Sequence, residues 1–131
     1  QLERLSVAAA ARRTHVSNYS SLLAGLPLKL PVDPADRESS WHLYVVEIDT
    51  TRCRASRAQV FAALRAAGIG VNVHYIPIHM QPYYRKLGFA PGQFPAAEAY
   101  YAQALSLPLF PQLMAGQQEE VAAVLRRALT A

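Results

Sequence analysis

A five-residue alternation in the middle of the sequence constrains the fold of this chain more than any other feature. From Val71 to Tyr75, apolar and aromatic residues alternate with Asn72 and His74, as they do in a strand that covers a core with one face. Pro77 then stops the pairing, because proline has no backbone N–H to give to a neighbouring strand. We therefore expect a strand that ends just before this proline.

Polar and aromatic residues gather directly after this stop. They are His79, Gln81, Tyr83, Tyr84 and Arg85. Loops at the ends of regular elements often carry binding residues, because the scaffold beneath them is rigid. We interpret this segment as a recognition edge, which the rest of the chain holds in place.

Two further strands and a capped helix surround this edge in the sequence. Residues 42–49 are rich in β-branched and aromatic side chains, and residues 105–109 form a short apolar run that prolines terminate. Both patterns favour strands. Ser56 and Gln59 match a capping box, which satisfies free N–H groups in the first turn of a helix. Gly68 suits the end of that helix.

Helical patterns occupy both ends of the chain and one segment between them. Apolar residues recur at helical spacing over residues 1–25, Pro95 suits the first turn of a helix over 96–104, and a last helix is expected over 117–129. Residues 26–40 have no period and indicate an extended connector. The predicted fold class is α+β, with a small sheet of about three strands and helices packed on one face.

We expect one domain, because 131 residues are enough to bury a core and fall within the usual size of a single domain. It would consist of a linking helix over residues 1–25, the connector over 26–40 and the α+β part over 41–131. The sequence opens on Gln1, without an initiator methionine and already in a helical pattern. We therefore expect a piece of a longer protein.

Composition argues against several functional classes. A hydrophobic fraction of 52% and a charged fraction of 17% argue against disorder. The net charge is +4, but the arginines are scattered, so we expect no nucleic-acid partner. No apolar run reaches the length of a bilayer, so we expect no membrane partner. The one cysteine, Cys53, cannot form an internal disulfide and suits a reducing compartment such as the cytoplasm.

Metal binding and nucleophilic catalysis find little support in the sequence. His42, Cys53, His74 and His79 are possible ligands, but the close Cys and His pairs of zinc sites are missing. Cys53 has no base beside it, so we interpret it as a turn residue. The glycines that follow the capped helix lack the third glycine and the following helix of a phosphate-binding loop.

His79 has two roles that the residues alone do not separate. Its imidazole could exchange hydrogen bonds with a sugar hydroxyl or, when protonated, pair with a phosphate oxygen. It could equally tie its loop together, as buried polar groups commonly do. We expect Tyr100 and Tyr101 to pack in the core and Glu98 to be solvated.

Two sequence blocks connect the chain with a known family. The H-Y-x-P-x-H block at residues 74–79, the S-L-P-L-F-P block at 106–111 and the run from Ser40 to Val46 resemble the C-terminal domain of DegT-type sugar-nucleotide aminotransferases. The resemblance covers essentially the whole chain. Within the family it is nearest to the transaminases that form UDP-4-amino-4,6-dideoxy-N-acetyl-beta-L-altrosamine for pseudaminic acid. The UDP-4-amino-arabinose transaminases share the second block and a similar histidine.

The resemblance implies a fold type I enzyme that uses pyridoxal phosphate to move an amino group from glutamate to the C4 ketone of a UDP-linked keto sugar. In this family a lysine of a large N-terminal domain holds the cofactor, and a homodimer completes the substrate cleft. Lys29 and Lys86 do not match that lysine motif. We therefore expect this chain alone to contain no catalytic residue, to bind no cofactor and to be inactive.

Motif position also implies which residues contact the substrate. His79 is carried over first, with Tyr75, Tyr83 and Tyr84 as further substrate-binding residues. Met114 stands where relatives often have a capping threonine, so we expect the last helix to start late or to fray. A second hypothesis stays open, namely a free-standing α+β module for ligand binding or regulation that dimerises through its sheet edge.

Overall fold

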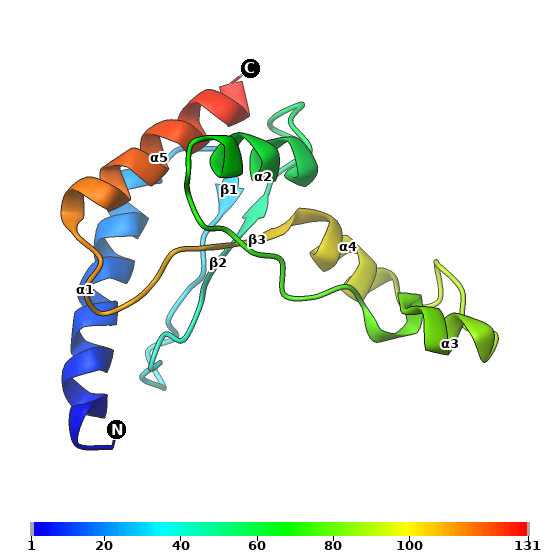
Figure 1. Ribbon diagram of the computed structural model, residues 1–131, viewed down its shortest axis with the longest axis horizontal. Helices are drawn as coiled ribbons and strands as arrows, with labels where there is room; N and C mark the ends of the chain where they lie inside the picture. Colours follow the sequence, from blue (N-terminus) through cyan, green and yellow to red (C-terminus); the bar gives the residue numbers. More distant parts are fainter. Residues whose placement is uncertain (1, 131) are drawn as a thin grey trace.

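Three short strands lie between two groups of helices in the computed structural model, which describes residues 2–130 (Figure 1). The sheet forms the middle of the molecule, and the longest helices, α1 and α5, lie together on one side of it. In chain order the elements are η1 (Leu2–Arg4), α1 (Leu5–Leu22), β1 (Leu28–Lys29), β2 (Tyr44–Ile48), α2 (Arg57–Ala66), η2 (Ile78–Met80), α3 (Pro82–Lys86), α4 (Pro95–Gln103), β3 (Ala104–Leu107) and α5 (Ala115–Thr130).

All neighbouring strands of the sheet are antiparallel, and β2 lies between β1 and β3. Val46 of β2 pairs with Leu105 of β3, and Ile48 pairs with Leu28 of β1. The first and last of the expected strands are confirmed as β2 and β3. β1 forms within the expected connector, so part of that segment is regular structure.

The strand expected from Val71 to Tyr75 is wrong. Only Asn72 pairs with the sheet, through an isolated bridge to Ser106 whose two backbone N–O distances are 3.2 and 2.9 Å. The side-chain oxygen of Asn72 accepts the N–H of Val73 at 2.8 Å, and this local bond competes with pairing along a strand. The alternation correctly predicted that Val71 is buried. It wrongly predicted a continuous series of strand hydrogen bonds.

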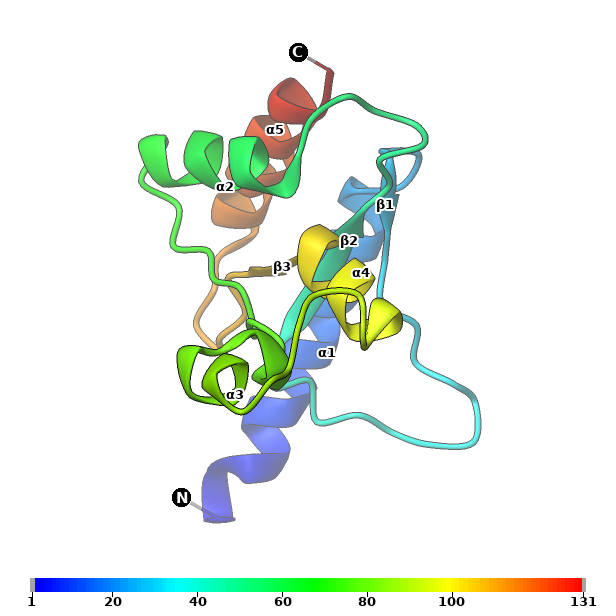
Figure 2. The same cartoon turned by 90° about the vertical axis from the view of Figure 1, so that its right-hand side faces the viewer.

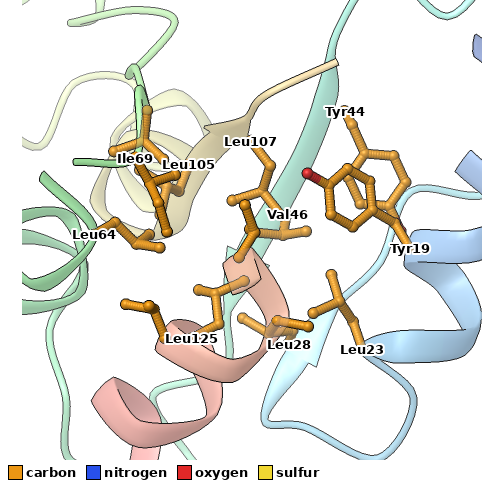
Figure 3. Close-up of a cluster of buried hydrophobic side chains, with 14 of the residues drawn as sticks. Tyr19, Leu23, Leu28, Tyr44, Val46, Leu64, Ile69, Leu105, Leu107 and Leu125 are labelled. Carbon is orange, nitrogen blue, oxygen red and sulfur yellow. The ribbon is translucent and has the colours of Figure 1, made fainter. Parts of the chain in front are cut away.

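The hydrophobic core lies between the sheet and one layer of helices (Figure 3). Tyr44 and Val46 of β2 are fully buried, whereas the residue between them is only partly covered. The facing residues of α1, α2 and α5 include Tyr19, Leu64 and Leu125. Full burial of a large apolar side chain stabilises a fold by about 1.5–3 kcal/mol. The predicted fold class, α+β with a small sheet of three strands, is confirmed, and the helices that cover the core, α1, α2 and α5, pack on one face of the sheet.

A second group of elements extends from the opposite side of the sheet (Figures 1 and 2). It comprises η2, α3 and α4, and α4 contacts the sheet through β2. We call residues 77–103 the aromatic lobe, because they include Tyr83, Tyr84, Phe89 and Phe94. Within α3 and α4 no residue is buried. The lobe therefore lacks the kind of core that supports the rest of the chain, which we call the body.

Helix boundaries follow the local capping residues. The opening helix expected over residues 1–25 is confirmed as α1, preceded by η1. The capping box before α2 is also confirmed: Oγ of Ser56 accepts the N–H of Gln59 at 3.3 Å, and Oε1 of Gln59 accepts the N–H of Ser56 at 2.8 Å. After α2, Gly68 has a φ of +78°, which glycine adopts without strain. None of the helices that the structure describes is both long and apolar enough to span a bilayer.

The last helix begins earlier than expected. α5 starts at Ala115 rather than near residue 117. Oε1 of Gln117 accepts the backbone N–H of Met114 at 3.0 Å, which is the half of a capping box that needs no hydroxyl group. The expectation of a late start is therefore wrong, because a glutamine inside the helix replaces part of the missing cap.

Candidate functional site

The four residues implied as substrate-binding are close in sequence but differ widely in exposure. Tyr75 is 72% exposed and Tyr83 is 67% exposed, whereas Tyr84 is 37% and His79 only 7% exposed. Tyr75 precedes the aromatic lobe, and the other three lie on η2 and α3. The tyrosines are thus accessible to a ligand, whereas His79 belongs mostly to the interior of the lobe.

His79 is held by a hydrogen bond and an aromatic ring. Its Nε2 lies 2.9 Å from Oε1 of Glu98 on α4, and the ring centroid of Phe94 lies 4.7 Å from that of the imidazole. An ionised carboxylate can only accept hydrogen bonds, so Nε2 carries a proton. In the neutral ring Nδ1 is then an acceptor, and no hydrogen bond to another group within residues 2–130 occupies it.

Glu98 joins three parts of the aromatic lobe, so the expectation that it is solvated is wrong. Besides the bond from His79, its carboxylate accepts the N–H of Gly92 at 2.7 Å and that of Phe94 at 3.4 Å. Its side chain is 22% exposed. The hydrogen bond from His79, and then those from the two backbone groups, hold the pKa of Glu98 below its usual range. One carboxylate thus connects η2, the loop before α4 and α4 itself.

An apolar cavity of about 390 Å³ opens beside His79. Aromatic rings follow one another along it, with centroid distances of 6.1 Å from Tyr84 to Phe89 and 6.3 Å from Phe89 to Phe94. The lining residues are Pro77, Ile78, His79, Tyr84, Phe89, Phe94 and Ala97. Aromatic walls with a single imidazole suit a ligand that has an apolar face and a hydroxyl group.

The first histidine of the H-Y-x-P-x-H block has partners that the sequence did not indicate. Nδ1 of His74 lies 2.8 Å from Oγ of Ser106, and its Nε2 lies 3.2 Å from Nδ2 of Asn72. Tyr75 packs edge-on against the same imidazole, at 4.7 Å between centroids. These bonds attach the segment that leads into the recognition edge to β3. A signal was present in the second block, because Ser106 is the one polar residue of an apolar strand.

The two tyrosines of α4 do not pack in the core, contrary to expectation. Tyr100 is 40% exposed. The guanidinium group of Arg57 on α2 lies over the ring of Tyr101, 4.9 Å from its centroid. The reason is that α4 lies on the side of the sheet away from α1 and α5 (Figure 2), where the main core does not reach.

The described residues offer neither a metal cluster nor an anchor for pyridoxal phosphate. Among residues 2–130, no three His, Cys, Asp or Glu side chains could hold an ion together. Cys53 is a turn residue, as expected, and its Sγ lies 3.5 Å from a backbone carbonyl of its own turn. Lys29 is 65% exposed and faces Glu47 at 3.8 Å, and Lys86 is exposed at the end of α3. A lysine that forms a Schiff base is activated in a desolvated pocket, so neither lysine fits this cofactor.

Comparison with known proteins finds relatives of the chain as a whole. The sequence model of the DegT/DnrJ/EryC1/StrS aminotransferase family matches residues 1–126. The spore coat polysaccharide biosynthesis protein SpsC of Bacillus subtilis (strain 168) is 34% identical over 129 residues, which are 96% of this chain and 33% of SpsC. This chain therefore spans about a third of the length of that relative.

Solved structures of related proteins have the same fold. The putative sugar aminotransferase Spr1654 of Streptococcus pneumoniae, in its PMP form, has a TM-score of 0.88 and 29% identity over 98% of this chain and 32% of its own. DesI, in the presence of its TDP-sugar product, has a TM-score of 0.89 and 25% identity over 98% of this chain and 33% of its own. The expected likeness to fold type I aminotransferases is thereby confirmed. Together with the family match, these findings show that the chain belongs to the DegT/DnrJ/EryC1/StrS aminotransferase family.

Proposed function

We propose that the chain is the C-terminal domain of a pyridoxal-phosphate-dependent transaminase, which moves an amino group from glutamate to the C4 ketone of a nucleotide sugar. The family match over residues 1–126 carries this proposal. The chain corresponds to 33% of SpsC, so a protein of that length has room for a separate cofactor-binding part. Because neither Lys29 nor Lys86 fits the cofactor, we assign the lysine that holds it to that other part.

In this proposal the chain forms one wall of the substrate cleft. The exposed rings of Tyr75 and Tyr83 can cover the apolar face of a sugar, because such faces pack well on aromatic rings. Tyr84 and His79 line the neighbouring cavity, where His79 offers a polar group. The four residues implied by the motif therefore form the proposed substrate-binding set, and the cleft is completed by a homodimer.

The proposed substrate is a UDP-linked 4-keto sugar of pseudaminic acid biosynthesis or of a related amino-sugar pathway. The H-Y-x-P-x-H and S-L-P-L-F-P blocks support the altrosamine transaminases as the nearest example. The TDP-sugar product of DesI supports a nucleotide sugar as the substrate class. The free thiol of Cys53 suits the reducing cytoplasm, which is the proposed location.

An assay of the complete protein that contains these residues tests the proposal. With glutamate and pyridoxal phosphate, we expect a UDP-linked 4-keto sugar to be converted to the 4-amino sugar, with one 2-oxoglutarate formed per turnover. The TDP-linked form of the same sugar is the matched comparison. If only the TDP-linked sugar were converted, the proposed nucleotide would have to be TDP in place of UDP. If no keto sugar were converted, the proposed function would be refuted.

The isolated chain provides a second, independent test. We expect no transamination and no new visible absorbance band when pyridoxal phosphate is added, because neither exposed lysine has the desolvated pocket that activates a Schiff-base amine. Borohydride reduction followed by mass spectrometry would detect a Schiff base. A stoichiometric adduct on Lys29 or Lys86, together with activity, would contradict the assignment of the cofactor to another part of the protein.

A further inference from the structure

We propose that Glu98 is a positioning residue, which holds His79 in the Nε2-protonated tautomer so that Nδ1 accepts a hydroxyl group of the sugar. The contact that motivates this inference is the 2.9 Å distance between Nε2 of His79 and Oε1 of Glu98. The inference rests on the proposed function, because the tautomer can affect sugar binding only if a sugar reaches His79.

The backbone of the aromatic lobe fixes the carboxylate of Glu98. The N–H of Gly92 lies 2.7 and 3.0 Å from its two oxygens, and the N–H of Phe94 lies 3.4 Å from Oε1. If the carboxylate turned away, both N–H groups would lose this shared acceptor and would have to bond with solvent instead. The loop that leads into α4 therefore holds Glu98, and Glu98 in turn orients His79. The two side chains are not free to rotate independently.

The fixed proton determines which chemical group His79 can bind. A neutral imidazole has one donor and one acceptor, so Nδ1 offers only a lone pair once Nε2–H is committed to Glu98. A sugar hydroxyl can donate a proton to that lone pair, whereas an ionised phosphate has none to donate. The neighbouring cavity of about 390 Å³ has aromatic walls, which suit the apolar face of a sugar ring. His79 should therefore contact the sugar rather than the diphosphate.

The tautomer can be measured without reference to activity. In the complete protein labelled with ¹⁵N-histidine, we expect the His79 signals at neutral pH to show a protonated Nε2 and an unprotonated Nδ1. The spectrum of a His79→Gln variant identifies these signals by their loss. A Glu98→Gln variant should keep the same tautomer, because the amide oxygen still accepts from Nε2–H. A protonated Nδ1 in the unsubstituted protein, alone or together with Nε2, would overturn the proposal.

Kinetics of the complete enzyme then test whether the positioning matters for binding. We expect Glu98→Ala to raise KM for the keto sugar by on the order of tenfold, with kcat and the KM for glutamate changed less than about twofold. Glu98→Gln should restore most of the affinity, since it retains the acceptor. Glu119→Ala, which removes an exposed carboxylate from α5, is the control and should leave all constants unchanged. An unchanged KM in Glu98→Ala would refute the inference.

A double variant distinguishes two roles of Glu98, namely orienting His79 and supporting the loop before α4 independently of His79. In a His79→Ala background, Glu98→Ala should raise KM by less than about twofold further, because the group that it positions is gone. A further tenfold increase would show that Glu98 acts independently of His79. The two proposals fail in different ways: an enzyme that converts no keto sugar refutes the function, whereas an active enzyme with independent effects refutes only the role of Glu98.

Discussion

The body and the aromatic lobe of this chain are stabilised in different ways. The body buries large side chains completely, among them Tyr44, Leu64 and Leu125. In the lobe, Ile78 is 65% exposed and Leu87 is 61% exposed, and no residue of α3 or α4 is buried. The body is thus a small hydrophobic core, whereas the lobe is a set of half-exposed rings around a polar centre.

The two regions also differ in the contacts that connect their parts. In the body, many apolar contacts act at once, so that each contributes to the stability of the whole fold. In the lobe, Glu98 connects His79, Gly92 and Phe94 through hydrogen bonds. Disturbing the body should therefore unfold the chain, and disturbing Glu98 should open the lobe alone.

The largest effect is expected from truncating the core of the body. Leu125→Ala should lower the free energy of unfolding by about 2–5 kcal/mol, because the substitution leaves a cavity among fully buried side chains. Urea denaturation followed by circular dichroism measures the change. The matched substitution in the lobe, Leu87→Ala, should change stability by less than about 0.5 kcal/mol, because that side chain is mostly exposed. Equal losses in the two variants would contradict the division into body and lobe.

The body was more predictable from the sequence than the lobe, and the reason is the range of the contacts. Helix periodicity and the capping box of Ser56 and Gln59 are local patterns, and both are confirmed. The contact between His79 and Glu98 joins residues 19 positions apart, and no periodic pattern in the sequence predicts it. Glu98 was for that reason expected to be solvated.

High pH should weaken the body through its buried tyrosines. Burial raises the pKa of Tyr19 above its ordinary value of 10.0, so the native state keeps a proton that the unfolded state releases. The resulting stability is present below about pH 10 and is lost as pH rises above it. At pH 11 the loss is about 1.4 kcal/mol for one such group.

Denaturation midpoints at pH 8 and pH 11 measure this effect. In a Tyr19→Phe variant, the decrease in the free energy of unfolding between pH 8 and pH 11 should be smaller by about 1.4 kcal/mol. Tyr83→Phe, in which an exposed ring of the lobe loses its hydroxyl group, should behave like the unsubstituted chain. If Tyr83→Phe reduced the alkaline loss as much as Tyr19→Phe, the buried phenol would not be its source.

Acid should open the lobe before it affects the body. The hydrogen bond from His79 lowers the pKa of Glu98 below its ordinary 4.5. The support that Glu98 gives is therefore present above pH 4.5 and is lost as pH falls through the lowered value. In NMR spectra between pH 6 and pH 3, the amide signals of Gly92 and Phe94 should shift while that of Val46 in β2 stays in place. Glu98→Gln should remove this acid step, and a simultaneous change in Val46 would argue for one cooperative unit.

The sequence indicated which residues to consider for the candidate site, but not the contacts that these residues make. The polar and aromatic residues after Pro77 lie in and between η2 and α3, at the start of the lobe. Their partners come from elsewhere in the chain: Ser106 of β3 binds His74, and Glu98 of α4 binds His79. Spacing reveals neighbours along one element, whereas these bonds depend on how separate elements pack.

The smallest expected effects come from adding the same capping residue to both regions. The residue just before each of α4 and α5 donates its backbone N–H to a side chain inside the helix. Phe94 donates to Glu98 in α4, and Met114 donates to Gln117 in α5. Met114→Thr should stabilise the body by about 0.5–1 kcal/mol, because the new hydroxyl can accept the N–H of Gln117 and complete the capping box. The side chain that it replaces is 64% exposed, so little packing is lost.

Phe94→Thr offers the same hydroxyl group to α4 but should have the opposite effect. It removes the ring that lies 4.7 Å from His79 and one of the walls of the cavity beside it. Amide hydrogen exchange of the lobe should therefore become faster in Phe94→Thr, while thermal unfolding of Met114→Thr moves to a higher temperature. If both substitutions stabilised their helices, the aromatic ring would add nothing to the lobe, and Glu98 would hold it without help from packing.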